Sequence, residues 1–141
     1  MFELTENQRM CKEISDNLAA VVAGRVCACP ECGAEMVLPA SVGDNYKCPF
    51  CGAVHDVDDL DASTLYDYFS DAYDIVYSVA SRHDEPRGVR VMVACGGPNI
   101  YIDSMSGDVE LYWWTDRARW PLSRDVVDAL DEWAAEMWGC M

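Results

Sequence analysis

The stretch CPECGAEMVLPASVGDNYKCPFCG, residues 29–52, contains two copies of a Cys-Pro-x-Cys-Gly turn separated by a short polar segment. Its cysteines are Cys29, Cys32, Cys48 and Cys51, which form two C-x2-C pairs with a gap of fifteen residues between them. Two cysteines three positions apart in a tight turn can aim both sulfurs at one ion, and this spacing is typical of a four-thiolate zinc site. We therefore predict one structural Zn²⁺ bound by these four cysteines.

The residues that follow each cysteine pair favour a metal site over disulfides. Gly33 and Gly52 directly follow the pairs, where glycine tolerates the backbone conformation that such a turn requires. Disulfides would need an oxidising compartment and would gain nothing from two matched turns. Because four thiolates complete a tetrahedral shell, the predicted metal has no open position for a catalytic water.

On these four ligand positions, residues 25–57 resemble a zinc ribbon with two zinc knuckles. Short strands are expected around residues 26, 36–38, 46 and 54–57, where they would hold the two metal-binding turns. Zinc ribbons serve transcription factors, ribosomal proteins, enzymes and protein adaptors, so the resemblance implies a metal and a fold but no activity.

Other cysteines and one histidine leave alternatives open. Cys27, two residues before the first ligand, is either a competing ligand or a packed thiol, and we expect the packed thiol. His55 could replace a ligand, although four thiols already suffice. Cys11 is expected to be structural and Cys140 to be an exposed thiol.

The charge of the chain excludes some classes of partner. The 141 residues include 25 acids and 10 bases, a net charge of −15, and residues 58–141 hold most of that excess. Direct binding to nucleic acid or to an anionic membrane is not expected, because affinity for a phosphate backbone comes from Lys and Arg. The sequence has neither a signal peptide pattern nor an apolar run of about 18 residues, so we expect a cytoplasmic protein.

The pattern of apolar residues predicts an α+β fold with two domains. Residues 1–57 would form an N-terminal helix plus the zinc ribbon, and residues 58–141 an acidic domain with an antiparallel sheet packed against helices. The first helix is expected over residues 5–23, where Thr5 and Gln8 have the spacing of a capping box. A second helix is expected over residues 62–72, capped by Asp61 or Ser63.

The C-terminal half alternates like a meander of antiparallel strands. Residues 73–80 fit a strand or a continued helix, and the β-branched residues favour the strand. Val89, Val91, Val93 and Cys95 alternate as the inward side of a strand, followed by a turn over residues 96–99 and by strands over residues 100–103 and 109–114. Pro121 and Ser123 are expected to open the last helix.

That last helix separates apolar and acidic residues. The apolar face would carry Val126, Leu130, Trp133 and Met137, and the opposite face Asp125, Asp128, Glu132 and Glu136.

No pattern for catalysis is present, and we expect no enzyme. The chain lacks a metalloprotease helix motif, a phosphate-binding glycine loop and a nucleophile elbow. Cys95 with His83 is the most tempting pair, but the alternation of its strand predicts that Cys95 lies in the core.

Two further motifs have both structural and functional interpretations. Gly96-Gly97-Pro98-Asn99 is a tight turn, and Tyr112-Trp113-Trp114 ends a predicted strand. If Trp113 faces the core, Trp114 points away with Tyr112 and is either covered or exposed as a contact site. This half resembles small uncharacterised proteins of phages and mobile elements.

The leading hypothesis is a non-enzymatic, acidic protein-binding module with one structural Zn²⁺. It would engage a basic protein surface, and its most concrete form is a phage or mobile-element inhibitor of a nucleic-acid-binding defence protein, an anti-CRISPR or anti-restriction protein that mimics DNA. The predicted partner-binding residues are Asp125, Asp128, Glu132, Glu136, Tyr112 and Trp114. The alternatives are acids that only confer solubility and a zinc-ribbon adaptor of transcription or translation.

Overall fold

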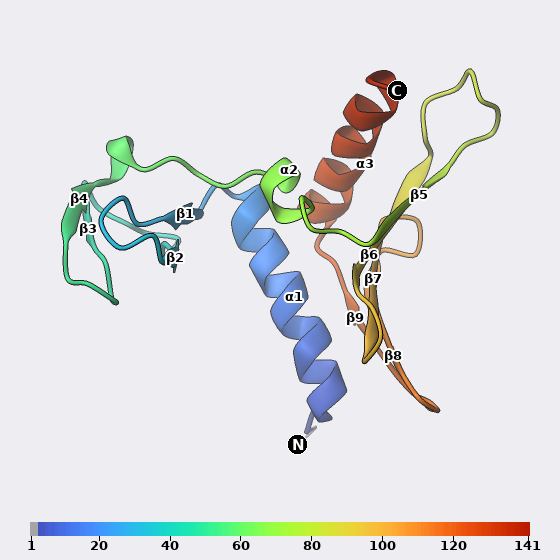
Figure 1. Ribbon diagram of the computed structural model, residues 1–141, viewed down its shortest axis with the longest axis horizontal. Coiled ribbons are helices and arrows are strands. Elements are labelled where there is room, and N and C mark those ends of the chain that lie inside the picture. Colours follow the sequence, from blue (N-terminus) through green and yellow to red (C-terminus); the bar gives the residue numbers. More distant parts are fainter. Residues whose placement is uncertain (1–2) are drawn as a thin grey trace. The chain divides into compact units, whose positions relative to one another are not determined.

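The computed structural model describes residues 3–141 and confirms a mixed α+β fold (Figure 1). Contacts divide the chain into two compact units. One unit is Ala20–Tyr68, and the other consists of the chain up to Ala19 together with Phe69–Met141. The expected boundary lay between residues 57 and 58, so the contacts place most of the N-terminal helix with the sheet instead of with the ribbon.

Helix α1 (Glu6–Val22) begins with the predicted capping box. The Thr5 backbone N–H donates to Gln8 Oε1 over 2.9 Å, and the Gln8 N–H donates to Thr5 Oγ1 over 3.1 Å. The helix ends before Gly24, which has a φ of +74° and donates its N–H to the Val21 carbonyl.

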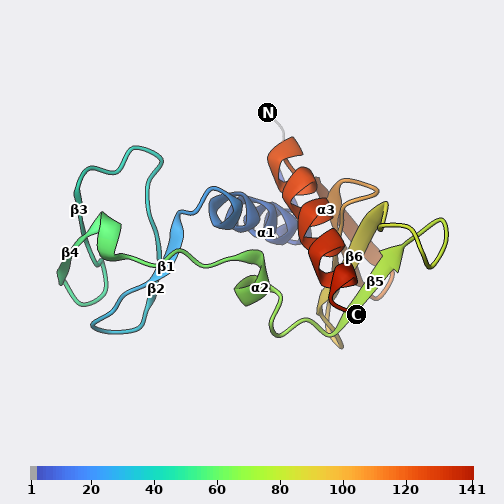
Figure 2. The same ribbon diagram turned by 90° about the horizontal axis from the view of Figure 1, so that it is seen from above.

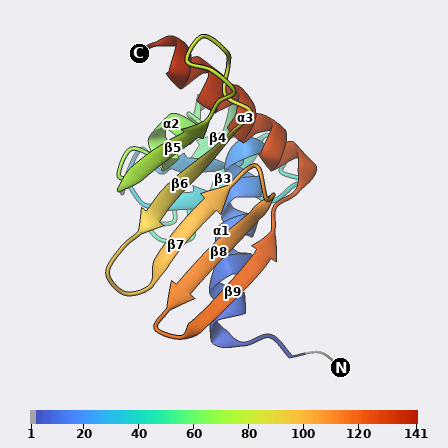
Figure 3. The same ribbon diagram turned by 90° about the vertical axis from the view of Figure 1, so that its right-hand side faces the viewer.

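The larger unit contains a five-stranded antiparallel sheet whose strands are neighbours in chain order (Figure 3). Its strands are β5 (Asp74–Ser78), β6 (Gly88–Ala94), β7 (Asn99–Asp103), β8 (Asp108–Trp113) and β9 (Asp116–Pro121). The strand alternative for residues 73–80 is therefore confirmed. Strand β9 was not predicted, and Pro121 ends this strand instead of opening the last helix.

Both long helices lie on the same side of this sheet (Figures 1 and 3). Midway along its length α1 is tied to β9, since Ser15 Oγ donates to the Pro121 carbonyl over 2.9 Å. Helix α3 (Arg124–Gly139) begins at the N-cap Ser123, whose Oγ accepts from the Val126 N–H. On the predicted apolar face of α3, Val126, Leu130 and Trp133 are buried and Met137 is partly buried.

Alternate residues of the strands supply the other half of the core. Val89, Val91, Ile102, Val109 and Leu111 are at most 1 % exposed, and they pair across neighbouring strands on one face. Two aromatic rings pack on α3: Phe69, from the segment before β5, lies 4.8 Å from Trp133, and Tyr77 of β5 lies 5.5 Å from Trp138 between ring centroids.

A β-bulge near the end of β6 corrects the predicted position of Cys95. Met92 pairs with Tyr101, but the next pair is Ala94 with Ile100, so Val93 has no partner on β7. The extra residue reverses the alternation, because two residues of β6 now oppose one of β7. Ala94, which pairs with the buried Ile100, therefore faces the core, and Cys95 is exposed instead of buried.

The second helix is shorter than predicted. Helix α2 covers only Leu65–Tyr68, and its cap is Thr64, not Asp61 or Ser63. The Thr64 N–H donates to Asp67 Oδ2 over 2.8 Å, and the Asp67 N–H donates to Thr64 Oγ1 over 3.4 Å. Before it, Asp56 caps a 3₁₀ turn (Val57–Asp59) in the segment that was expected to be a linker.

The smaller unit contains two strand pairs (Figure 2). β1 (Val26–Ala28) pairs with β2 (Glu35–Val37), and β3 (Asn45–Lys47) pairs with β4 (Val54–Asp56). Each pair encloses one Cys-Pro-x-Cys-Gly turn, which is the arrangement expected for the ribbon.

Candidate functional site

The two cysteine turns have the same backbone geometry. In the first, the Gly33 N–H donates to the Cys29 carbonyl and the Cys29 N–H to the Ala34 carbonyl, each over 2.8 Å. In the second, Gly52 donates to Cys48 over 2.9 Å, and Cys48 donates to Ala53 over 2.8 Å. Both glycines have a positive φ, +75° and +79°, which other residues rarely adopt. The repeated sequence thus folds into two equivalent knuckles.

The knuckles bring the four predicted ligands together. The Sγ atoms of Cys29, Cys32, Cys48 and Cys51 all lie within 4.8 Å of one another. Cys29 and Cys51 are 3.7 Å apart, as are Cys32 and Cys48. A bond length of about 2.3 Å to zinc places the sulfurs of a tetrahedron about 3.8 Å apart. The spacing therefore fits four ligands around one ion and is too long for a disulfide.

The electrostatics of the cluster favour a cation at its centre. The Cys32 backbone N–H lowers the pKa of the Cys29 thiol to about 6, and the Cys51 backbone N–H lowers that of Cys48. For Cys51 the Ala53 N–H also acts to lower the pKa, but desolvation and the neighbouring thiols outweigh it and raise the pKa to about 12. Two thiolates in the cluster thus oppose the deprotonation of a neighbouring thiol. A divalent cation bound between the sulfurs would relieve that repulsion.

A histidine that was not expected to take part lies beside the cluster. His55 Nε2 is 3.4 Å from Cys29 Sγ, so an N–H on this nitrogen would donate to the thiolate. Such contacts outside the ligand shell orient the ligands and tune the metal. His55 belongs to β4, and its cross-strand partner is Tyr46. In the sequence, its only signal was its position four residues after Cys51.

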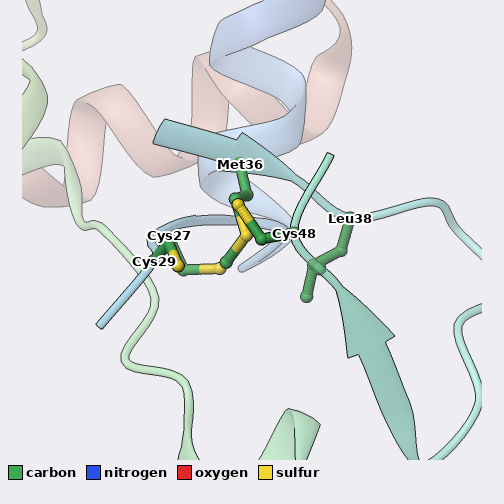
Figure 4. Close-up of a cluster of buried hydrophobic side chains, with 5 residues drawn as sticks. All are labelled: Cys27, Cys29, Met36, Leu38 and Cys48. Carbon is green, nitrogen blue, oxygen red and sulfur yellow. The ribbon is translucent and has the colours of Figure 1, made fainter. Parts of the chain in front are cut away.

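Cys27 is a packed thiol and not a fifth ligand within the described cluster. It is 2 % exposed, pairs with Met36 across β1 and β2, and lies in a small core with Leu38 (Figure 4). Burial raises its pKa, which keeps the thiol protonated. The same core includes Cys29 and Cys48, so it supports both knuckles.

The acidic residues predicted to bind a partner lie on the exposed face of α3. Asp125, Asp128, Glu132 and Glu136 are all exposed, whereas Val126, Leu130 and Trp133 are buried. Arg124 lies on the same helix, and its Nε is 3.4 Å from Asp128 Oδ1 with both side chains largely exposed. Such a pair contributes little to stability. We refer to Asp128, Glu132 and Glu136 as the acidic ridge.

The predicted aromatic contacts lie at one end of the sheet. Trp114 is 91 % exposed and Trp113 40 %, while Tyr112 is partly buried. Strand β8 ends at Trp113, and Trp114 stands in the turn to β9 with a φ of +56°. The turn over residues 96–99 lines the same open pocket as residues 112–114. The two motifs that the sequence showed separately are therefore adjacent.

The structure does not assemble the pair of Cys95 and His83. His83 lies in the exposed loop before β6, and Cys95 follows the last residue of this seven-residue strand. At about 3.3 Å per residue, a strand of this length separates its ends by roughly 20 Å.

Comparisons of the chain with protein families, with curated proteins and with solved structures find no match. The resemblance of the C-terminal half to phage and mobile-element proteins gains no support from them. Among residues 3–141, no helix combines the length and the apolar character that crossing a bilayer requires.

Proposed function

We propose that this protein is a non-enzymatic binding module, stabilised by one Zn²⁺, that engages a basic surface of another protein through the acidic ridge of α3. Its most specific form is an inhibitor, carried by a phage or mobile element, that occupies the DNA-binding surface of a defence protein. The metal would be structural, because four thiolates leave no ligand position open.

The observation that carries this proposal is the separation of faces on α3. Folding uses Val126, Leu130 and Trp133, which are buried, whereas the acids on the opposite face are exposed. The acidic ridge has like charges four residues apart, a spacing of about 6 Å along the axis that disfavours a helix. Glu136 also lies in the last turn of α3, where the helix dipole disfavours negative charge. A row of carboxylates on a rigid helix can take the place of phosphates on a basic surface.

The proposal is tested by neutralising the acidic ridge with Asp128→Asn, Glu132→Gln and Glu136→Gln. Wild type and this variant are used to capture proteins from cell extracts, with quantification by mass spectrometry. Nucleic-acid-binding proteins should be enriched on wild type, released by added duplex DNA and by salt, and lost from the variant. Screening beyond about 8 Å at physiological ionic strength explains the expected salt dependence.

A matched control removes the same charge elsewhere. Asp58→Asn, Asp59→Asn and Asp61→Asn change three exposed acids of the smaller unit and leave the cap Asp56 intact. This variant should retain the captured proteins. Equal loss from both variants would show that only net charge matters, and equal capture by all three proteins would refute the role of the acidic ridge.

A second candidate function, a zinc-ribbon adaptor, is favoured by one observation on the smaller unit. Phe50, inside the second knuckle, is 69 % exposed, and Val54 at the start of β4 is 64 % exposed. Large apolar side chains exposed on a rigid knuckle are typical of a protein contact. If this face binds the partner, Phe50→Ser should abolish capture while the ridge variant does not.

A further inference from the structure

An open pocket lies where the β6–β7 turn meets the end of β8. Residues 96–99 form one wall and residues 112–114 the other, around a volume of ≈ 370 Å³. Asn99 pairs with Tyr112 across β7 and β8, which brings the two walls together. The pocket is thus built from the β6–β7 turn and the end of β8 in one sheet.

The turn wall holds its shape through its own contacts. Gly96 has a φ of +95°, and its N–H donates to Asn99 Oδ1 over 2.9 Å. Gly97 lies against Trp113, since a Cβ added to it would be 3.4 Å from the indole Cζ3. The indole of Trp113 therefore lies close to the backbone of this turn.

The other wall exposes two indoles at a cost to the fold. Trp114 is 91 % exposed and has a φ of +56°, a left-handed conformation that is unfavourable for a bulky residue. Backbone outliers of this kind cluster at functional sites. Trp113 is 40 % exposed, although it lies on the same side of β8 as the buried Val109 and Leu111.

A network on the opposite face of the sheet fixes the third aromatic ring. The Tyr112 hydroxyl donates to Glu110 Oε2 over 3.2 Å, and the Tyr112 ring lies 6.0 Å from that of Tyr101, edge to face. Glu110 is 3 % exposed and pairs with Arg90. Tyr112 is therefore held in place before any ligand arrives.

We propose that this pocket binds the guanidinium group of an arginine in a basic segment of the partner. Indole faces attract cations, and a planar guanidinium stacks on them while keeping its charge. Asp116 and Arg117, the cross-strand partners of Trp113 and Tyr112, carry opposite charges. The field of the net charge of −15 adds a long-range attraction for a cationic segment.

The same sheet already shows this chemistry within the chain. The Arg90 guanidinium carbon lies 4.1 Å from the centroid of the Tyr101 ring, and Lys12 Nζ lies 6.0 Å from that of Trp120. Tyr101 is thus occupied by an internal cation, whereas the indole of Trp114 is exposed. The inference rests on the proposed function for the basic character of the partner, but it assigns a surface separate from the acidic ridge.

The test uses the whole, zinc-loaded protein labelled with ¹⁵N and a blocked tetrapeptide containing two arginines. A peptide with citrulline in place of arginine has nearly the same shape without the charge. The arginine peptide should shift the indole N–H resonances of Trp113 and Trp114 and leave that of the buried Trp133 unchanged. Its dissociation constant should be about tenfold lower than that of the citrulline peptide.

Two variants separate this inference from the proposed function. Trp114→Ala should weaken binding of the arginine peptide about tenfold, whereas the ridge variant should still show the Trp113 and Trp114 shifts. Equal binding of the citrulline peptide, or of a proline-rich peptide of the same length, would overturn the assignment to arginine. If the resonance shifts vanish only in the ridge variant, the pocket is not the arginine site, and the proposed function still holds.

Discussion

Arg90 Nη1 lies 2.6 Å from Glu110 Oε2, although strand β7 separates the strands that carry them. Both side chains lie on the face of the sheet opposite α3, where Glu110 is 3 % exposed. A second guanidinium, that of Arg119, lies 3.5 Å from Glu110 Oε1. A buried carboxylate needs such partners, because an unpaired charge away from water is strongly unfavourable.

Removing this carboxylate should therefore destabilise the fold. Glu110→Ala leaves Arg90 without its closest anion, with only Asp103 at 3.0 Å. We expect the free energy of unfolding in urea to fall by about 3 kcal/mol, the lower end for breaking a buried ion pair.

The matched control is Asp84→Ala, an exposed acid in the loop before β6. Its effect should stay within about 0.5 kcal/mol. If Glu110→Ala were equally harmless, the network would contribute nothing to the stability of the sheet.

The four clustered cysteines predict both the zinc content of the protein and the part of the fold that depends on the metal. Native protein should contain one zinc per chain, because the four Sγ atoms lie within 4.8 Å and their spacing fits a tetrahedron. Chelation should increase hydrogen exchange first in residues 25–57, since metal binding supplies folding free energy in small ribbons. Cys29→Ser should reduce the zinc content measured by elemental analysis.

Two exposed cysteines provide controls for the zinc measurement. Cys95→Ser and Cys140→Ser remove thiols that lie outside the described cluster, so each should retain one zinc per chain. Native protein without zinc, or equal loss in all three variants, would contradict the assignment of ligands.

The Cys11 thiol should make stability depend on alkaline pH. Burial raises its pKa from 9.0 to about 11, and Asp108 adds to the increase. The folded state holds this proton more tightly than the unfolded chain, so the contribution is complete below pH 9 and is lost as the pH rises toward 11.

The measurement compares urea unfolding of wild type and Cys11→Ala at pH 8 and pH 10.5. Wild type should lose on the order of 1–2 kcal/mol more than the variant over this range. Parallel losses would mean that Cys11 titrates normally.

The bulge on β6 predicts which thiols react in the native state. Cys95 and Cys140 are exposed, whereas Cys11 is fully buried and Cys27 is 2 % exposed. Brief alkylation of zinc-loaded protein, read by peptide mass spectrometry, should modify the first two and spare the other two. Protection of Cys95 would mean that β6 continues its alternation without the bulge.

The parts of the fold that could be predicted are those in which local spacing determines the geometry. Two matched turns predicted the four clustered thiols, and the opposed faces of α3 predicted which residues are buried. The capping box at Thr5 and Gln8 is likewise a relation between residues three apart.

The parts that were missed depend on contacts between strands. The bulge at Val93 arises from pairing with β7 and leaves no mark on the alternation of β6 itself. Strand β9 follows a two-residue turn at Trp114 that has no glycine or asparagine to signal it. The pocket required the pairing of Asn99 with Tyr112, thirteen residues later in the chain.

The conformation of Trp114 predicts opposite effects on stability and on binding. Its φ of +56° costs about 1 kcal/mol for a residue with a Cβ, and at 91 % exposure its side chain contributes little burial in return. Trp114→Gly should therefore raise the free energy of unfolding by up to about 1 kcal/mol, since glycine adopts this conformation readily. Trp114→Ala keeps the Cβ, so it should leave stability close to that of wild type. Both variants should bind the arginine peptide about tenfold more weakly, which isothermal titration calorimetry can measure. A glycine variant less stable than wild type would show that the indole supports the turn, and unchanged peptide binding by both variants would remove Trp114 from the pocket's function.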